Sequence, residues 1–176
     1  VGAEESVVSL AFSPDGKILA SGSGFAESAI RLWDAATGAE MGRLEGHRRF
    51  TSQLLFLDTQ TLAGAGGDAT IRIWDVPTRR LQRTLRGHTL ELTSLALMPD
   101  RRTLVSGAKD GAIMFWNTTG SLERRGMITF PSGVAALRFS NGSDAVIALG
   151  SGNRTVVARP VRVGIHLELC AVMAFQ

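Results

Sequence analysis

Cysteine is nearly absent from the sequence: Cys170 is the single one among 176 residues. One cysteine excludes an internal disulfide framework and is typical of a reducing compartment, so we expect a cytoplasmic protein. No stretch approaches the run of about 18 apolar residues that a membrane-spanning helix needs. The chain does not open on a basic segment followed by an apolar run, which predicts no secretory signal peptide, although its start at Val1 leaves open a leader that was removed.

Lysine is scarce as well. Of the 19 basic residues only Lys17 and Lys109 are lysines, and the formal net charge is +3. The arginines form four clusters that raise the hypothesis of nucleic-acid binding: Arg48/Arg49, Arg79/Arg80/Arg83/Arg86, Arg101/Arg102 and Arg124/Arg125. All four fall at predicted turns or outer strands with acidic residues interspersed, where charge keeps sheet edges soluble. We therefore do not expect a nucleic-acid partner.

Signals for cofactor chemistry are missing too. No His, Cys and Asp residues stand at the spacing of a metal site, so no metal is predicted. No glycine-rich stretch lies between a strand and a helix, where it could cradle a phosphate, and no other cofactor is expected. No segment shows a helical period over ten or more residues, which predicts an all-β chain. Hydrophobic residues make up 44% of the sequence, enough for a packed core.

What the sequence does contain is an internal repeat. Trp33-Asp34 and Trp74-Asp75 stand 41 residues apart, and Trp116-Asn117 follows 42 residues later. The pairs Gly46-His47 and Gly87-His88 are also separated by 41 residues. A fixed period of this length is typical of repeat architectures.

The segments around the tryptophans repeat in phase. Each tryptophan ends an alternating strand: "AIRLWD" at 29–34, "TIRIWD" at 70–75 and "AIMFWN" at 112–117. A strand rich in small residues precedes each one: "LASGS" at 19–23, "LAGAGGD" at 62–68 and "LVSGAKD" at 104–110. A fourth, degenerate copy follows, with Arg159 and Pro160 in place of Trp and Asp.

These motifs resemble the WD40 repeat family over roughly residues 6–172, and three copies in phase make the resemblance specific. The resemblance implies an all-β β-propeller of four-stranded antiparallel blades. Four blades are expected within 1–176, at approximately 6–46, 47–87, 88–130 and 131–173.

The resemblance also implies a structural hydrogen-bond network in each blade. The histidine of Gly-His bonds an aspartate in the turn before the tryptophan strand and meets a serine or threonine hydroxyl, which accepts the indole N–H. Mutual pairing of this kind satisfies buried polar groups. The third repeat has the full set, His88, Ser106, Asp110 and Trp116.

The other repeats are incomplete. The second has His47, Asp68 and Trp74, but Gly64 occupies the hydroxyl position, so its indole needs another acceptor. The first has Ser21 and Trp33, with Glu27 at the turn position. The fourth keeps Asn153 at the acidic position, with Leu149 and Arg159 in place of Ser and Trp.

His88, Ser106 and Asp110 have the composition of a hydrolase triad. The set recurs with the structural period, the second repeat has Gly64 at the nucleophile position, and Ser106 lies in no G-x-S-x-G elbow. We therefore predict no catalytic residues and no enzyme activity. His166 is expected at a surface or edge position.

The predicted function is a non-catalytic scaffold of the WD40 type that binds protein or peptide partners on its loops. The resemblance places candidate partner-binding residues at the starts of inner strands and before the turn acid: Arg49, Phe50, Glu91 and Lys109. Phe50 is the strongest anchor candidate, with packing on its own blade edge as the alternative. The alternative function is a regulatory or sensor domain of a larger protein such as a signalling kinase.

The sequence leaves three arrangements open for the array. It is part of a longer propeller, a half-ring completed to eight blades by a homodimer, or a self-closed ring of four blades. The apolar segment "LELCAVMAF" at 167–175 reads as a strand awaiting cover and fits the first two.

Overall fold

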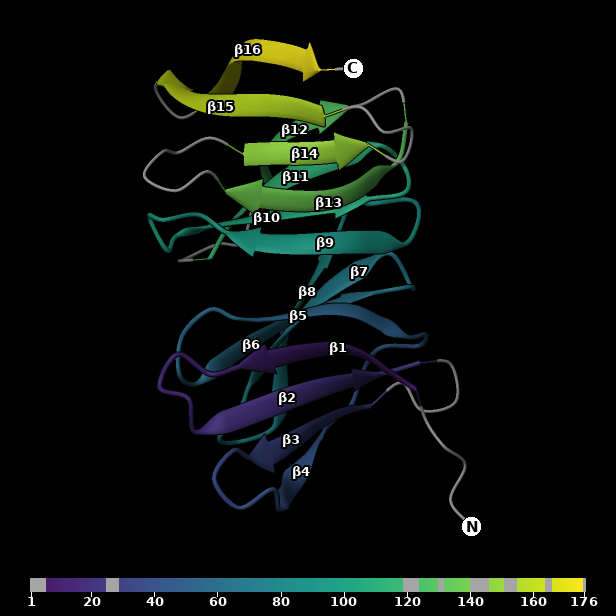
Figure 1. Cartoon of the computed structure of the whole chain (residues 1–176), viewed down its shortest axis with the longest axis vertical. Coiled ribbons are helices and arrows are strands. Elements are labelled where there is room, and N and C mark those ends of the chain that lie inside the picture. The colour runs from purple at the N-terminus through teal and green to yellow at the C-terminus, as the bar shows by residue number, and fades with distance from the viewer. Residues whose placement is uncertain are drawn as a thin grey trace. The chain divides into compact units, whose positions relative to one another are not determined.

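The computed structural model describes residues 6–24, 29–118, 124–129, 132–139, 146–150, 155–163 and 166–175. Every regular element in these residues is a β-strand, and the strands form four sheets of four antiparallel strands each (Figure 1). Strands that follow one another in the chain are neighbours in the sheet, so each sheet is an up-and-down meander. The prediction of an all-β chain built from four-stranded antiparallel blades is confirmed.

The chain divides into two compact units, residues 1–92 and 93–176. Two sheets make up the first unit. Sheet 1 contains β1 (Val7–Phe12), β2 (Ile18–Ser23), β3 (Ile30–Asp34) and β4 (Glu40–Leu44). Sheet 2 contains β5 (Thr51–Phe56), β6 (Thr61–Gly66), β7 (Thr70–Asp75) and β8 (Arg80–Arg86).

The second unit holds the other two sheets. Sheet 3 contains β9 (Leu92–Leu97), β10 (Thr103–Ala108), β11 (Ala112–Asn117) and β12 (Arg124–Thr129). Sheet 4 contains β13 (Val134–Phe139), β14 (Val146–Gly150), β15 (Thr155–Val163) and β16 (His166–Phe175). The apolar segment 167–175 lies in β16, which pairs with β15. The described residues include no helix of the length and apolarity that would cross a membrane.

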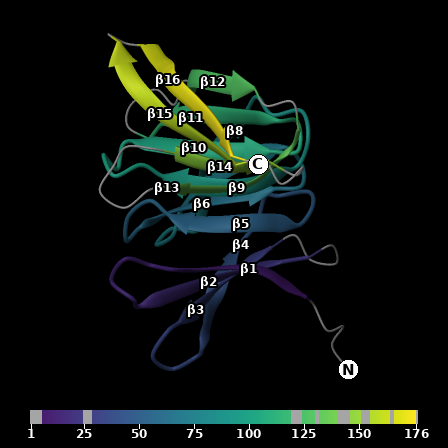
Figure 2. The same cartoon turned by 45° about the horizontal axis from the view of Figure 1, so that its top comes forward.

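Sheets 1 and 2 pack face to face, and β1 lies beside β5 in both views (Figures 1 and 2). Their shared core includes Ile30 and Leu32 of sheet 1 and Phe56 and Trp74 of sheet 2. A small residue permits the close approach, because a Cβ on Gly22 would lie 2.9 Å from the Cβ of Thr51. Small-residue second strands therefore serve sheet-to-sheet packing, which needs interdigitation at near-crystalline density.

A polar contact reinforces that packing at the start of the inner strands. The Ser9 hydroxyl donates to the main-chain carbonyl of Thr51 at 2.9 Å. The second unit uses the same device, since the Thr93 hydroxyl donates to the carbonyl of Val134 at 2.6 Å. There too a glycine lies at the contact, and a Cβ on Gly107 would meet the Val134 side chain at 2.6 Å.

Strand register shows which side chains share a face. Phe12, Leu19 and Trp33 are paired across β1, β2 and β3, so they lie on one face of sheet 1. The same pairing in sheet 2 places three residues on one face: Phe56, Leu62 and Trp74. In sheet 2 this face packs on sheet 1 and is buried, whereas Phe12 is 63% exposed.

Candidate functional site

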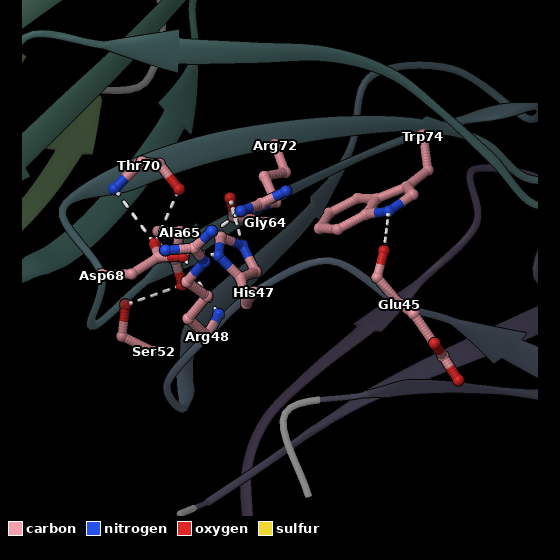
Figure 3. A network of polar contacts seen from close by, with 10 residues as sticks. All are labelled: Glu45, His47, Arg48, Ser52, Gly64, Ala65, Asp68, Thr70, Arg72 and Trp74. Atoms are coloured by element: carbon pink, nitrogen blue, oxygen red, sulfur yellow. Dashed lines mark hydrogen bonds and ion pairs between the residues drawn. The ribbon is translucent and has the colours of Figure 1, made fainter.

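The second repeat gathers its polar residues around His47 (Figure 3). The Nδ1 atom of His47 lies 3.1 Å from Asp68 Oδ1, and its Nε2 atom lies 3.2 Å from the carbonyl oxygen of Gly64. Both ring nitrogens of His47 thus face oxygen atoms, the carboxylate of Asp68 on one side and the main-chain carbonyl of Gly64 on the other. His47 is buried, and it ties the loop before β5 to β6 and to the β6–β7 turn.

Asp68 is the centre of this network. It accepts the Thr70 hydroxyl at 2.6 Å, the Thr70 N–H at 3.2 Å and the Arg48 N–H at 3.1 Å. Burial raises the pKa of Asp68, but the hydrogen bonds from His47, Thr70 and Arg48 outweigh it and hold the pKa well below the ordinary range. The Arg72 guanidinium forms a looser ion pair with Asp68, with 3.6 Å between Nη2 and Oδ2. Asp68 is therefore a charged anchor for the loop that begins β5.

Two glycines make room for the network. A Cβ on Gly66 would lie 2.3 Å from His47 Nδ1, and a Cβ on Gly64 would lie 2.9 Å from the Trp74 ring. The rings of His47 and Trp74 meet edge to face, with centroids 5.4 Å apart. The glycines are thus required by the approach of two aromatic rings to β6.

The indole of Trp74 finds a main-chain partner. Its N–H donates to the carbonyl of Glu45 at 3.0 Å, on the loop that leads to His47. In the first and third repeats the indole N–H donates to a serine hydroxyl at 2.8 Å, Trp33 to Ser21 and Trp116 to Ser106. A carbonyl replaces the hydroxyl where Gly64 stands, and no side-chain pattern could have indicated that acceptor.

The remaining network positions are placed as follows. His88 and Ser106 are buried, and Asp110 accepts the Ala112 N–H at 2.9 Å. Leu149 is 37% exposed and pairs with Ala136. Glu27 and Asn153 fall outside the described residues, as does the side chain of Arg159.

The aspartates that follow Trp33 and Trp74 have a role of their own, which the repeat pattern alone did not reveal. Asp34 accepts the Thr37 N–H at 2.7 Å and its hydroxyl at 2.8 Å, and Asp75 accepts the Thr78 N–H at 2.8 Å and its hydroxyl. These hydrogen bonds lower the pKa of both aspartates. A carboxylate of this kind fixes the turn into the outer strand.

The tryptophans thus recur in sheets 1 to 3, the turn aspartates in sheets 1 and 2, and the buried histidines before β5 and β9. A family model described as "WD domain, G-beta repeat" matches residues 1–34, 38–75 and 79–117. The chain belongs to the WD40 repeat family. Each match ends with a tryptophan strand: the first covers β1 to β3, the second β4 to β7 and the third β8 to β11, so the second and third matches begin with the outer strand of the preceding sheet.

Three WD-repeat relatives illustrate the likeness. The chain is 32% identical over 114 residues to the anaphase-promoting complex subunit cdh1 of Dictyostelium discoideum, covering 63% of this chain and 15% of that protein. It is 32% identical over 114 residues to the B-type cell cycle switch protein ccs52A of Medicago truncatula, covering 63% and 24%. It is 34% identical over 113 residues to periodic tryptophan protein 2 of Arabidopsis thaliana, covering 63% and 12%. The aligned segment thus spans about a quarter or less of these curated relatives.

The candidate partner-binding residues of this WD40 chain occupy two loops in the first unit and one turn in the second. Arg49 Nη1 lies 3.3 Å from Glu91 Oε1, and the Arg49 side chain is 55% exposed. Phe50 is half-buried and covers Gly67, where a Cβ would lie 2.6 Å from the ring. Lys109 is exposed on the turn after β10. The ring of Phe50 thus lies against the β6–β7 turn of its own sheet, and both interpretations of Phe50 stay predictions.

Metal ligands do not gather in the part of the chain that the structure describes. No group of three or more His, Cys, Asp or Glu side chains there could hold a metal ion. What the arrangement can do chemically is hold loops in place.

Proposed function

We propose that this WD40 chain is a non-catalytic scaffold that binds a protein or peptide on the loops before the inner strands. The observation that carries the proposal is the Asp68 network, which fixes the loop bearing Arg48, Arg49 and Phe50. A loop held by buried hydrogen bonds presents its exposed side chains at low entropic cost on binding. The Arg49–Glu91 pair extends this surface to the next loop of the same kind.

The burial of Ser106 supports a role without catalysis. Its side chain is inaccessible, and its hydroxyl accepts the Trp116 indole N–H, so a substrate has no path to it. A nucleophile must reach the reacting atom of its substrate.

The names of the relatives support a protein partner. The Dictyostelium relative is named as a subunit of the anaphase-promoting complex, and the Medicago relative as a cell cycle switch protein. By likeness, we infer that this chain also works by assembly with other proteins, and the cytoplasm stays its predicted compartment.

Affinity purification of the tagged chain, followed by mass spectrometry, tests the proposal. Arg49→Glu and Phe50→Ala should each remove the same set of co-purifying proteins. The matched control is Arg102→Glu, which reverses an exposed charge on the β9–β10 turn and should leave that set unchanged. Retention of every partner by both loop variants, at unchanged melting temperature, would rule out this surface.

A further inference from the structure

Residue 79 holds a backbone conformation that its residue type rarely adopts. The turn between β7 and β8 places Arg79 at a φ of 59°, in the left-handed region. The matching turn of sheet 1, counted from Asp34 as this one is from Asp75, has Gly38 at that position, with a φ of 72°. Glycine adopts this region without steric cost, whereas a residue with a Cβ loses free energy there. The arginine of sheet 2 must therefore make an interaction that compensates for the strain.

The Arg79 side chain crosses to the outer strand of sheet 1. Its guanidinium donates to the main-chain carbonyl of Met41 and lies on Gly42, where a Cβ would stand 2.6 Å from Arg79 Cζ. The φ of Gly42 is 149°, a value that L side chains rarely adopt. Glycine is thus required at position 42 twice, by the backbone conformation and by the guanidinium that covers it.

A bulge in β4 provides the acceptor. In the pairing of β3 with β4, Leu32 lies opposite Gly42 and Trp33 lies opposite Glu40, so Met41 is the extra residue. The extra residue of a bulge is outside the regular ladder of main-chain hydrogen bonds. The carbonyl of Met41 therefore receives a donor from sheet 2, and a charged donor makes a stronger hydrogen bond than a neutral one.

A second arginine of sheet 2 reaches sheet 1 in a similar way. A Cβ on Gly46, whose φ is 146°, would stand 3.1 Å from Arg72 Nη1. The Arg72 side chain is 12% exposed and pairs with Asp68, so it belongs to the buried network. Arg79 is exposed and follows the far end of β7, away from that network. The contact of Arg79 can therefore open without disturbing the buried one.

We propose that Arg79 is a latch: its contacts with Met41 and Gly42 fasten the bulged outer strand β4 to sheet 2, and they open locally while the two sheets stay packed. Leu44, at the other end of β4, is buried in the core between the sheets and stays in place when the latch opens. The latch lies at the end of β7 opposite to the loops of the proposed function, so either proposal can fail alone.

Hydrogen exchange of the full chain, followed by mass spectrometry of its peptic peptides, tests the latch. Arg79→Ala keeps a Cβ at the strained position and removes the guanidinium. The amides of β4 should then exchange about fivefold faster, the equivalent of one net hydrogen bond. The amides of β6, in the middle of sheet 2, should keep their rates. If β6 accelerates by the same factor, or if β4 keeps its rate, the latch is excluded.

Arg79→Gly separates the latch from the backbone strain. Glycine relaxes the turn and also removes the guanidinium, so β4 should still exchange faster than in the wild type. If β4 exchanges at the wild-type rate or more slowly, the arginine only strains the turn and the proposal is wrong.

Arg80→Ala is the matched control. Arg80 is the next residue in the chain, is exposed as well, and lies in β8 opposite Asp75. Its replacement should leave the exchange of β4 unchanged. An acceleration equal to that of Arg79→Ala would mean that positive charge near the turn protects β4, and the latch would be ruled out.

A double-mutant cycle tests whether the guanidinium rests on Gly42. Gly42→Ala should accelerate the exchange of β4, because its Cβ strains the backbone and displaces the guanidinium. In the Arg79→Ala background only the backbone effect remains, so the same change should accelerate exchange by a smaller factor. If the factors of the two variants multiply independently, the contact is absent in solution and the proposal fails.

Discussion

Sheets 1 and 2 carry the same residue types at the same register positions, but these side chains differ in how far they are exposed to solvent. Leu10 and Phe12 of sheet 1 are 60% and 63% exposed, whereas Leu54 and Phe56 of sheet 2 are 4% and 5% exposed. The second pair packs against Ile30, Leu32 and Leu44 on the opposite face of sheet 1. The face of sheet 2 that carries its tryptophan is therefore buried by sheet 1, which precedes it in the chain. Side-chain type does not by itself determine burial.

The two sheets also solve the same polar problem in two ways. Trp33 uses a side-chain acceptor, Ser21, and Trp74 uses a main-chain one, Glu45. In sheet 2 the Trp74 ring lies against Gly64, so atoms of the ring fill the space that a serine side chain at position 64 would occupy. The comparison teaches that the indole N–H must be satisfied, while the identity of the acceptor is free.

The largest expected effect tests the difference in burial between Phe56 and Phe12. Phe56→Ala should lower the free energy of unfolding by about 3 to 5 kcal/mol, because it leaves a cavity between two sheets. Phe12→Ala, at the corresponding exposed position, should change it by less than about 0.5 kcal/mol. Urea denaturation followed by tryptophan fluorescence measures both. Equal losses would mean that the Phe12 face is covered in solution.

Restoring the missing hydroxyl of sheet 2 should harm the protein. Gly64→Ser places a Cβ 2.9 Å from the Trp74 ring, and we expect a loss of about 2 kcal/mol from overpacking. Urea denaturation of Gly64→Ala is the control, since it adds the Cβ without the hydroxyl and should cost a similar amount. A stabilised Gly64→Ser variant would show that the indole prefers a hydroxyl acceptor.

Asp68→Asn tests whether the polar network of sheet 2 depends on the charge of Asp68, because that charge varies with pH. The folded pKa of Asp68 is lowered, so its contribution to stability is complete above the unfolded value of about 4 and is lost as pH falls through the folded value. The variant should lose about 2 kcal/mol at pH 7. Its deficit relative to wild type should shrink between about pH 5 and pH 2 in urea titrations. A stability deficit of Asp68→Asn that stays constant over this pH range would show that the loss comes from altered packing or hydrogen-bond geometry and not from the missing charge.

The smallest effect concerns the indole of sheet 1. Ser21→Ala removes the acceptor of Trp33 and should cost about 1 kcal/mol, a typical net hydrogen bond. Ser106→Ala, at the fully buried equivalent in sheet 3, should cost more, because water cannot replace the acceptor there. Differential scanning calorimetry of the two variants checks the order, and the reverse order would contradict it.

The patterns around the Trp-Asp and Gly-His pairs were enough to predict the strands, because alternation is a local property. The antiparallel sheets and the partnership of Trp116 with Ser106 followed from the resemblance to the WD40 family that those patterns carry. Three contributors were missed: the Glu45 carbonyl, the Thr70 hydroxyl and the Arg48 N–H. Two of them are main-chain groups, and every residue type carries those. Thr70 did leave a signal, since a threonine two residues after an aspartate is typical of a turn in which the carboxylate is capped.

By itself the sequence determined that this chain forms all-β WD40 sheets, because alternation, small-residue strands and turn acids act over a few residues. Tertiary structure decided which tryptophan face is buried, which acceptor the Trp74 indole takes, and that Arg79 contacts Gly42 of the neighbouring sheet. Burial depends on the neighbouring sheet, the acceptor on the space left beside Gly64, and the Arg79 contact on a bulge in the strand pairing of sheet 1. Each of these is a relation between segments distant in the chain or across a strand pair, and residue order alone does not state it.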